Sequence, residues 1–459
     1  MSRKASSEEI FEHMTPWQAV RAMAVPTVIS QLIVLIYNLA DTYFVGQTNN
    51  RYMVAGVSLI LPVFNLILAM GSLYGAGGGA LLPKLLAAGR REEASRTAAY
   101  CLRSAALLAL GFSAALLLFT GPILHLLGAG ENTFGYARTY VLTVLVIGGL
   151  PTLLSNVLSN LLRSLGLSRA AGVGVALGGV LNLVLDPLFM FVLLPPGREV
   201  LGVGLATLLS NCIACSYCLW TFFRRQKEIV PLFLAPAPER GSVRAVYGVG
   251  IPGTVGTLLF DVDYMVLDRL ASGYGDAALA AIGIVLKAER LPQQVGVGLC
   301  QGMVPLVAYS YARRDEKRVR AVMGCTLKIG LAVALVSVTV YQLFTPQIVR
   351  LFICDPETLA IGTGFLRVRS VAAVIMFFCF FVVFVYQGLG DGKRAMTLAV
   401  LRWAVLNIPM LFILNRLIGM YGLVWSQVVS DLLTVLVSYT MLILTLHRWK
   451  QKGMAAPGK

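Results

Sequence analysis

Long runs without a charged side chain are the feature that most constrains how this chain can fold. Asp, Glu, Lys and Arg are missing throughout 52–83, 104–130, 139–162, 200–223, 291–312, 329–349 and 370–390. Further runs broken by only a few charges occupy 22–45, 170–197, 245–270, 395–415 and 420–447. A helix of about 20 apolar residues crosses the bilayer core, so the pattern predicts about twelve transmembrane helices.

The composition excludes the other broad classes of protein. Hydrophobic residues make up 57% of the chain and charged residues only 13%, and a soluble domain cannot bury so much apolar surface. The runs are also too long for the strands of a membrane barrel. We therefore expect an all-α polytopic membrane protein. The sequence shows no phosphate-binding motif for ATP and no nucleophile–base arrangement, so we do not expect an enzyme.

The basic residues alternate between rich and poor connections. They gather in `GRREEASR` (89–96), `YARRDEKRVR` (311–320) and the connection 224–244, whereas the intervening connections carry about one each. Lysine and arginine are enriched in cytoplasmic connections, so we place both termini in the cytoplasm. The net charge of +16 is then explained by the bilayer surface, and no nucleic acid partner is expected.

The two halves of the chain echo each other at an offset of about 225 residues. `AVP` (24–26) recurs as `GIP` (250–252), and `RSLGLSRA` (163–170) recurs as `QGLGDGKRA` (387–395). Six helices per half predict two bundles in parallel orientation around a central cavity. Pro26 and Pro252 each interrupt the first helix of a half, either as a moving hinge or as a static kink.

The repeat gives the expected domain organisation. We expect an N-terminal segment at 1–20, a first six-helix lobe at 21–226, a linker at 227–243, a second lobe at 244–448 and a tail at 449–459. The first segment and the tail are expected on the cytoplasmic side.

Acids inside apolar runs are the strongest functional signal, because they are costly in lipid and tend to face a cavity or a partner. Asp41 and Asp186 reach a similar depth in the outer half of the first lobe. Asn38 and Asn182 precede them by one helical turn, and Thr207 adds a hydroxyl at that depth. Such oxygens suit a monovalent cation or a shared proton. The competing explanation is that each acid pairs with a buried base or caps a helix.

`NLADTYFVG`, `NLVLDPLF` and `LLRSLGLSRA` within a six-plus-six repeat resemble the multidrug and toxic compound extrusion (MATE) family, in its prokaryotic DinF-like branch. The resemblance covers essentially the whole chain and implies efflux driven by a cation. It implies a cation site at Asp41, Asn182, Asp186 and Thr207. The same resemblance suggests that Asn156, Asn160 and Tyr140 line the first lobe. Asn38, on the same helix face as Asp41, and Tyr37 are further candidates for lining the cavity.

The second half departs from this family pattern. Its first helix carries Asp261 and Asp263, and Lys287 follows in the next helix. An internal ion pair of Lys287 with either acid, a contact with the transported molecule, and a side chain that reaches to the interface are the alternatives. Asp391 and Asp431 are expected to be loop or helix-end charges.

The predicted function is secondary active export of amphipathic, often cationic drugs or metabolites in exchange for Na⁺ or H⁺. The alternative is export or flipping of a specific lipid-linked or anionic metabolite, which Lys287, Arg290, Arg367 and Arg369 would favour if they faced the cavity. We expect a monomer in a bacterial or archaeal plasma membrane without a cofactor. Cys212, Cys215 and Cys218 spread around a helix, so no transition-metal site is expected.

Overall fold

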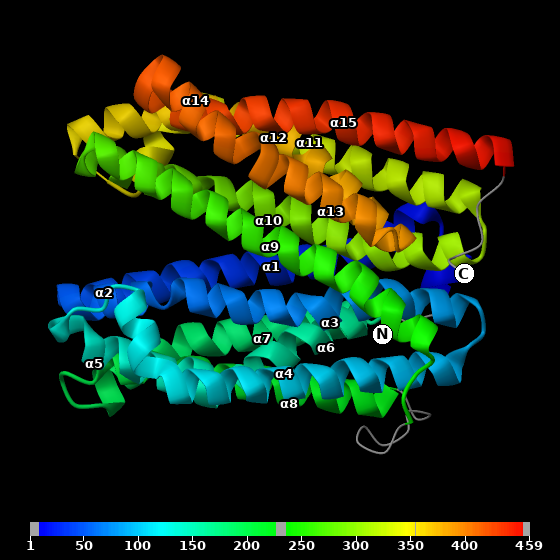
Figure 1. Cartoon of the computed structure of the whole chain (residues 1–459), viewed down its shortest axis with the longest axis horizontal. Helices are drawn as coiled ribbons and strands as arrows, with labels where there is room; N and C mark the ends of the chain where they lie inside the picture. Colours follow the sequence, from blue (N-terminus) through cyan, green and yellow to red (C-terminus); the bar gives the residue numbers. More distant parts are fainter. Residues whose placement is uncertain (1–8, 226–235, 354, 453–459) are drawn as a thin grey trace. The chain divides into compact units, whose positions relative to one another are not determined.

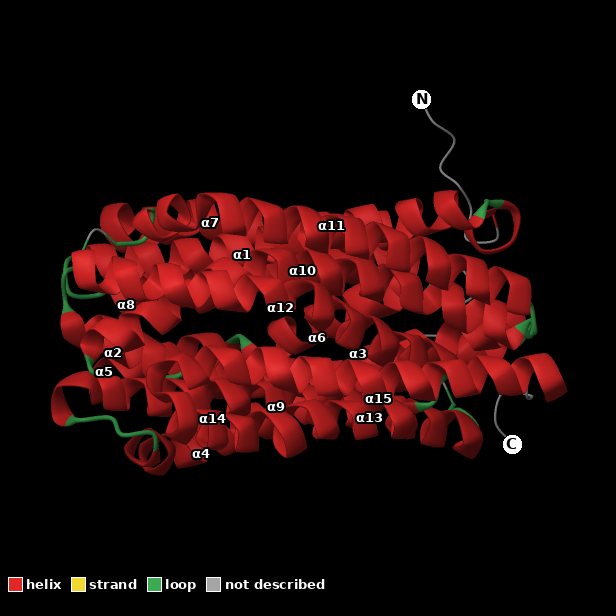
Figure 2. Ribbon diagram, turned by 90° about the horizontal axis from the view of Figure 1, so that it is seen from above, coloured by secondary structure: helices red, strands yellow, loops and turns green. Residues whose placement is uncertain are grey.

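The structure, a computed structural model, describes residues 9–225, 236–353 and 355–452. Residues 1–8 of the expected N-terminal segment, 227–235 of the expected linker and 453–459 of the expected tail lie outside this description. The described residues form helices and short connections without a strand, and within each half the helices run alongside one another (Figures 1 and 2). The expectation of an all-α fold is confirmed.

The first half forms six spans, three of which consist of more than one helical element. They are α1 (Pro16–Gln47); α2 (Arg51–Leu59) with α3 (Leu61–Ala87); α4 (Arg91–Leu126); α5 (Glu131–Tyr140) with η2 (Val141–Ile147) and α6 (Gly149–Ser164); α7 (Ser168–Pro187) with η3 (Leu188–Leu193); and α8 (Glu199–Arg225). A short helix, η1 (Glu9–His13), precedes them.

The second half repeats this order. Its elements are α9 (Arg240–Ala271) with η4 (Ser272–Tyr274); α10 (Asp276–Ala312); α11 (Glu316–Arg350); α12 (Pro356–Leu389); α13 (Gly392–Val400) with η5 (Leu401–Asn407) and α14 (Ile408–Ile418); then η6 (Gly419–Tyr421) and α15 (Gly422–Lys452).

Counting spans among the described residues gives the predicted number. Ten helical stretches are long and apolar enough to cross a membrane, and the pair 131–147 and 149–164, bent by 50°, supplies an eleventh. The final stretch, Gly392–Trp449, reverses at Gly419, whose φ of +61° is accessible to glycine at little cost. It therefore contains two spans, and α14 packs back against α15.

The internal repeat is visible in the backbone. The third span of the first half bends at Phe119 (φ −109°, ψ 19°), and the third span of the second half bends at Phe344 (φ −113°, ψ 19°). In each case the following threonine, Thr120 or Thr345, donates its hydroxyl to a carbonyl one turn earlier. Such a hydroxyl bond and a nearby proline both favour a helix bend. The expected six-plus-six repeat is confirmed.

Contacts divide the chain into two compact units whose boundaries fall inside helices. Unit 1 contains Ile29–Gly250, and unit 2 contains the described residues of 8–28 and 251–459. The boundary in α1 follows Pro26 by two residues, and the boundary in α9 precedes Pro252 by two. The first helix of each half thus begins in one unit and continues in the other.

Unit 2 holds the beginning of α1 by close packing and by a polar contact. A Cβ added to Gly302 of α10 would lie 2.7 Å from Ala24 Cα, so only glycine permits this helix separation. Phe11 of η1 stacks on Tyr309 with ring centroids 4.7 Å apart. The Tyr309 hydroxyl donates to Glu12, which also lies 3.2 Å from Arg313.

Unit 1 holds the beginning of α9 in the same way. A Cβ on Gly77 of α3 would lie 2.3 Å from the Val246 carbonyl oxygen. Ser242 donates a 2.6 Å hydrogen bond to the buried carboxylate of Glu93, at the start of α4. The beginnings of α1 and α9 are therefore each fixed to the unit formed mainly by the other half of the chain. In both cases a close glycine contact and a carboxylate hold the segment.

We predict that Gly302→Ala destabilises unit 2, because the new methyl group meets backbone atoms that cannot give way. Overpacking of this kind costs about 1–3 kcal/mol. Thermal unfolding in detergent should show a lower Tm for this variant. Gly283→Ala is the matched control, because a Cβ on this other glycine of α10 meets nothing within 4 Å. Equal Tm values for the two variants would contradict the packing argument.

We also predict that acid releases the N-terminal segment. The Tyr309 hydrogen bond, together with Arg313, holds the pKa of Glu12 below its ordinary value. The lowered pKa means that the ionised carboxylate stabilises the docked segment at every pH above the ordinary carboxyl pKa. This stabilisation is lost as the pH falls through the lowered pKa. Hydrogen exchange at residues 9–13, corrected for intrinsic rates, should show protection at neutral pH that disappears in acid.

Tyr309→Phe should remove most of that neutral-pH protection, and Tyr311→Phe should leave it in place. The idea fails if the Tyr309 variant keeps the native protection.

Candidate cation site

Asp41 and Asp186 are brought together by tight packing of α7 against the second part of α1, within unit 1. A Cβ on Gly179 of α7 would lie 2.7 Å from Ile33 and 3.0 Å from the Tyr37 ring. The glycine lets the two helices approach closely enough for their acids, both further along, to face each other. The two carboxyl groups are within hydrogen-bonding reach. The sequence prediction that they share one depth is consistent with this geometry.

Asn182 and Thr207 complete the cluster. The Asn182 amide donates to Asp186 Oδ1 at 3.2 Å and to the Thr207 hydroxyl oxygen at 3.3 Å. Asp186 is 0% exposed, and Asn182 and Thr207 are also buried. The fifth span thus contributes an amide and a carboxylate, and the sixth span contributes a hydroxyl. These three groups converge near Asp41 of the first span.

Several oxygens in the cluster lack any donor. Asp41 Oδ1, Asn182 Oδ1 and Asp186 Oδ2 are buried and have no hydrogen-bond partner among the described residues. No ion pair links either acid to a base in the part of the chain that the structure describes. Buried oxygens without donors are costly, and a small cation or a proton is what would satisfy them.

Two tyrosines adjoin the acids. Tyr140, which is buried, lies close enough to both carboxyl groups to interact with them electrostatically, and Tyr37 is close to Asp41. Asp186 is followed by Pro187 and then by the π-helical segment η3. Pi-helical turns are frequent at functional sites because they change the direction of side chains. Sequence reasoning had no signal for this segment.

Asn38, Asn156 and Asn160, also expected to line the first lobe, make their own hydrogen bonds. Asn38 is exposed and donates to the Val34 carbonyl. Asn160 of α6 donates to Asn156 at 3.0 and 3.2 Å, and both asparagines pack against glycines of α3. The structure brings Asn156 and Asn160 together, and a lining role for the three asparagines stays a prediction.

The acids expected in unit 2 separate as the helix periodicity predicts. Asp263 is 1% exposed and accepts both hydrogen bonds from the Asn407 amide, whereas Asp261 is half-buried. Lys287 is exposed on α10. The alternative that Lys287 pairs with Asp263 is wrong, because the two form no ion pair and an amide occupies the carboxylate.

Sequence reasoning missed two buried ion pairs in unit 2. Arg369 donates to Glu289 at 2.8 Å, and Arg402 donates to Asp431 at 2.7 and 3.1 Å. The expectation that Asp431 is a helix-end charge is therefore wrong, since it is 0% exposed. Asp391 does cap a helix, accepting from the Arg394 backbone. Complementary charges within apolar runs were the available signal for the ion pairs.

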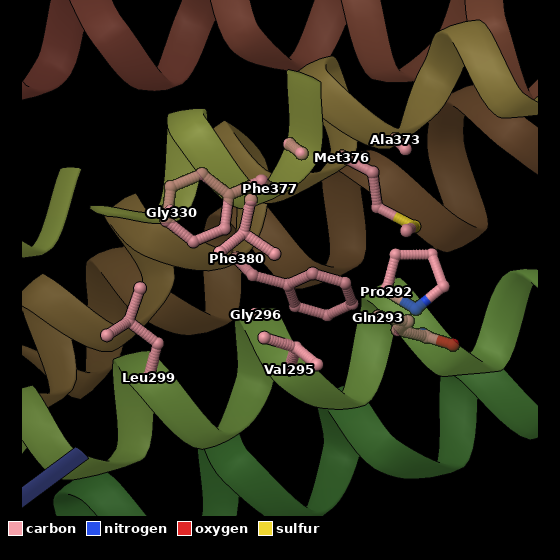
Figure 3. Close-up of a pocket in the computed structure, with 12 residues that line it drawn as sticks. Pro292, Gln293, Val295, Gly296, Leu299, Gly330, Ala373, Met376, Phe377 and Phe380 are labelled. Atoms are coloured by element: carbon pink, nitrogen blue, oxygen red, sulfur yellow. The ribbon is translucent and has the colours of Figure 1, made fainter. Parts of the chain in front are cut away.

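Unit 2 also contains a small apolar crevice between α10, α11 and α12 (Figure 3). The ring of Phe377 fills space that a side chain at Gly330 would occupy, since a Cβ there would lie 1.7 Å from the ring. Gln293 is the polar side chain at its edge. A crevice of about 20 Å³ holds a single water molecule, so it is too small for a drug-sized ligand.

Comparison with known proteins places the chain among membrane transporters. A profile of the MatE family matches residues 26–188 and 252–413, one stretch in each half. The multidrug export protein MepA of Staphylococcus saprophyticus is 28% identical over 439 residues, and the match covers 95% of both chains.

Solved structures share the fold. One described as the outward-facing conformation of a multidrug resistance MATE family transporter of the MOP superfamily superposes with a TM-score of 0.91 at 22% identity, covering 98% of this chain and 100% of that one. A MOP superfamily transporter from Pyrococcus furiosus, described as having a binding pocket of reverse polarity, gives 0.90 at 22% identity, covering 98% and 99%. These similarities confirm the twelve-helix architecture.

We predict that Asp186→Asn stabilises the protein, and more so at pH 8 than at pH 5. Two adjacent buried carboxyl groups repel each other once both are ionised, and an amide at position 186 removes that repulsion. Thermal unfolding at the two pH values should show the larger gain in Tm at pH 8. Glu131→Gln, at an exposed acid of the same unit, serves as the control. A Tm lowered equally at both pH values would show that the acids are structural.

Proposed function

The chain belongs to the MatE family, and from this premise we propose that it is a secondary active exporter of amphipathic, often cationic small molecules driven by Na⁺ or H⁺. The coupling cation binds at Asp41, Asn182, Asp186 and Thr207. The multidrug export proteins to which the chain is similar along 95% of its length support this class of cargo. Catalysis of a covalent reaction is not part of the function of such a transporter.

The observation that carries the proposal is the unpaired acid cluster of unit 1. Two carboxyl groups, an amide and a hydroxyl converge without a base, and three of their oxygens are buried without a donor. Maintaining such a cluster in an apolar bundle is unfavourable unless a cation neutralises it. Entry of one positive charge from outside is favoured by about 2.3 kcal/mol per 100 mV of membrane potential.

The path of α1 supports a way to couple the cation to a change of conformation. The part of α1 from Pro16 to Val28 belongs to unit 2, whereas Asp41 on the same helix lies in unit 1. Pro26 lies next to this boundary, and Thr27 donates its hydroxyl to the Met23 carbonyl. The missing amide donor and the added hydroxyl bond both permit bending. We propose Pro26 as a hinge, with Pro252 as its counterpart in α9.

The charges of unit 2 favour a cationic over an anionic cargo. Arg369 is buried, and its charge is balanced by Glu289, so it offers no free positive group to an anion. Arg290 lies over the rings of Phe260 and Tyr264, at 6.0 and 5.8 Å from their centroids. The alternative function, export of an anionic or lipid-linked metabolite, therefore has weaker support.

We further propose that the protein is a monomer in the plasma membrane of a bacterium or archaeon, with both termini cytoplasmic. The alternation of basic connections supports this orientation. Labelling of single cysteines introduced near residues 91 and 131 by a membrane-impermeant reagent tests it. Only the second should react in intact cells.

We predict that Asp41→Asn and Asp186→Asn, made separately, each abolish cation-driven export because the coupling charge is lost. Purified variants in proteoliposomes receive a Na⁺ gradient or a pH gradient, one at a time, and efflux of a fluorescent lipophilic cation is followed. The gradient that drives the native protein identifies the coupling ion.

Glu131→Gln should transport as the native chain does. Glu131 is an exposed acid at the start of α5 and is not part of the cation cluster. The site would be refuted by undiminished coupling in both Asp variants. Downhill exchange of cargo without a gradient distinguishes lost coupling from a misfolded protein.

A further inference from the structure

The turn between α10 and α11 repeats the backbone of the turn between α3 and α4. Ala88 and Arg313 follow the preceding helices with φ of −83° and −78°. The next residue has a positive φ in both turns, +73° at Gly89 and +57° at Arg314. These two positions are 225 residues apart, which is the offset of the internal repeat. The turn thus requires a left-handed residue, which is glycine in unit 1 and arginine in unit 2.

Arginine is the less favourable residue at this position. Glycine adopts a positive φ freely because it has no Cβ atom, whereas the backbone of an arginine is strained there. Strain that persists at one residue indicates a use for its side chain. The orientation of the chain in the membrane does not explain Arg314, because four other basic residues already lie between 313 and 320.

The positive charge of Arg314 is not neutralised within the protein. Its exposed side chain forms no ion pair with any residue that the structure describes. Asp315, the adjacent acid, instead caps α11 by accepting from the Arg318 backbone at 2.9 Å. Lys317, in the first turn of α11, is exposed and likewise has no ion pair with a described residue. Two positive charges therefore remain on the surface of this turn.

The corresponding turn of unit 1 differs in charge as well as in its left-handed residue. Its basic side chains Arg90 and Arg96 form ion pairs with Glu239 and Glu92. Gly89 has no side chain to offer. The arrangement at Arg314 is therefore a property of unit 2 and not of the repeat.

The end of α15 packs against both sides of the Arg314 turn. Tyr311, before the turn, has its ring 5.7 Å from that of Trp449, and Arg320, after the turn, donates to the Leu446 carbonyl at 2.9 Å. Arg448, next to Trp449, is exposed and forms no ion pair within the described part of the chain. Helix α15 thus brings a third basic side chain to this end of unit 2.

An apolar surface continues along α15 from these charges. Leu436, Ile443 and Leu444 are 60%, 47% and 53% exposed. Exposed apolar side chains within a membrane span are covered by the acyl chains of lipids. Tryptophan and tyrosine, here Trp449 and Tyr311, are enriched where the acyl chains meet the head groups. Apolar, aromatic and basic side chains therefore follow one another in the order of the parts of a phospholipid.

We propose that unit 2 has a binding site for an anionic phospholipid, whose phosphate contacts Arg314, Lys317 and Arg448 and whose acyl chain lies along α15. Basic clusters at the membrane surface recognise anionic head groups. Arginine suits a phosphate because its planar guanidinium donates two N–H groups to two oxygens. This contact offsets the backbone strain of Arg314. The lipid holds unit 2 at the membrane surface at a turn where unit 1 has no equivalent side chain.

Native mass spectrometry of the full chain in a mild detergent tests the site. Dioleoyl phosphatidylglycerol is the anionic probe and dioleoyl phosphatidylcholine the neutral one. The first phosphatidylglycerol should bind more tightly than the first phosphatidylcholine. Arg314→Gln should weaken its binding by about fivefold, the effect of one basic residue near anionic lipid. Arg314→Lys keeps the charge and should retain most of the affinity.

Arg350→Gln is the matched control, because Arg350 is an exposed arginine at the opposite end of α11. This variant should bind phosphatidylglycerol as the native chain does. The proposal is overturned if Arg314→Gln leaves the affinity unchanged. It is also overturned if Arg350→Gln lowers the affinity as much, since that result would show a general effect of net charge.

Thermal unfolding gives a second readout, which separates lipid binding from the stability of the turn. Arg314→Gly relieves the strained φ and should raise the Tm in detergent without added lipid. Phosphatidylglycerol should raise the Tm of the native chain through binding, and Arg314→Gly should lose most of that increase. The variant thus gains stability and loses the ligand, so misfolding cannot explain the loss.

A third arm uses sodium phosphate in place of the lipid. Inorganic phosphate has the same charged oxygens but no acyl chain, so it should raise the native Tm much less than phosphatidylglycerol does. An equal rise that depends on Arg314 would overturn the assignment to a lipid. No arm requires a gradient or transport, so the outcome is independent of the proposed coupling cation.

Discussion

The energetic constraint behind this structure is that a carboxylate inside an apolar helix bundle must have a partner. In unit 2, two of three buried acids are paired with arginines, and such pairs are stable enough to persist as part of the fold. In unit 1, Asp41 and Asp186 have each other and no base among the described residues. The difference separates structural charges from charges that are kept available for an ion.

Backbone features decide where those acids lie. Gly179 lets α7 approach α1, and the π-helical segments η3 and η5 follow or contain the polar residues of the fifth span in each half. The close glycine contact and the π-helical segments both interrupt regular helix packing locally. Their occurrence at corresponding points of the repeat suggests that the geometry of the first cluster was retained in the second half while its side chains changed.

Much of the fold was predictable because the bilayer imposes a length on every span. Runs of apolar residues predicted the spans, and depth along a helix predicted that Asp41 and Asp186 could meet. Hydropathy reports how deep a residue lies and not which neighbour it faces. The partner of Asp263 is 144 residues away at Asn407, and nothing local to Asp263 indicates it.

The two wrong expectations, for Asp431 and for Lys287, also arise because hydropathy does not show which neighbour a residue faces. Asp431 was assigned to a helix end because a single acid in an apolar run is most simply placed at its edge, but Arg402 in the preceding span neutralises it. Lys287 was a reasonable partner for Asp263 by charge, yet its side chain is exposed. Only the packing of α9, η5 and α15 determines which of several charged residues come together.

The division of α1 and α9 between the two units has a consequence for how such a chain arises and assembles. Each half donates the beginning of its first helix to the other, as subunits do when they exchange arms in a swapped dimer. Neither half is then a complete folding unit when cut at the connection between them. A polypeptide fused from two copies of an ancestral dimer would inherit this exchange, and its halves would depend on each other from the moment the second was synthesised.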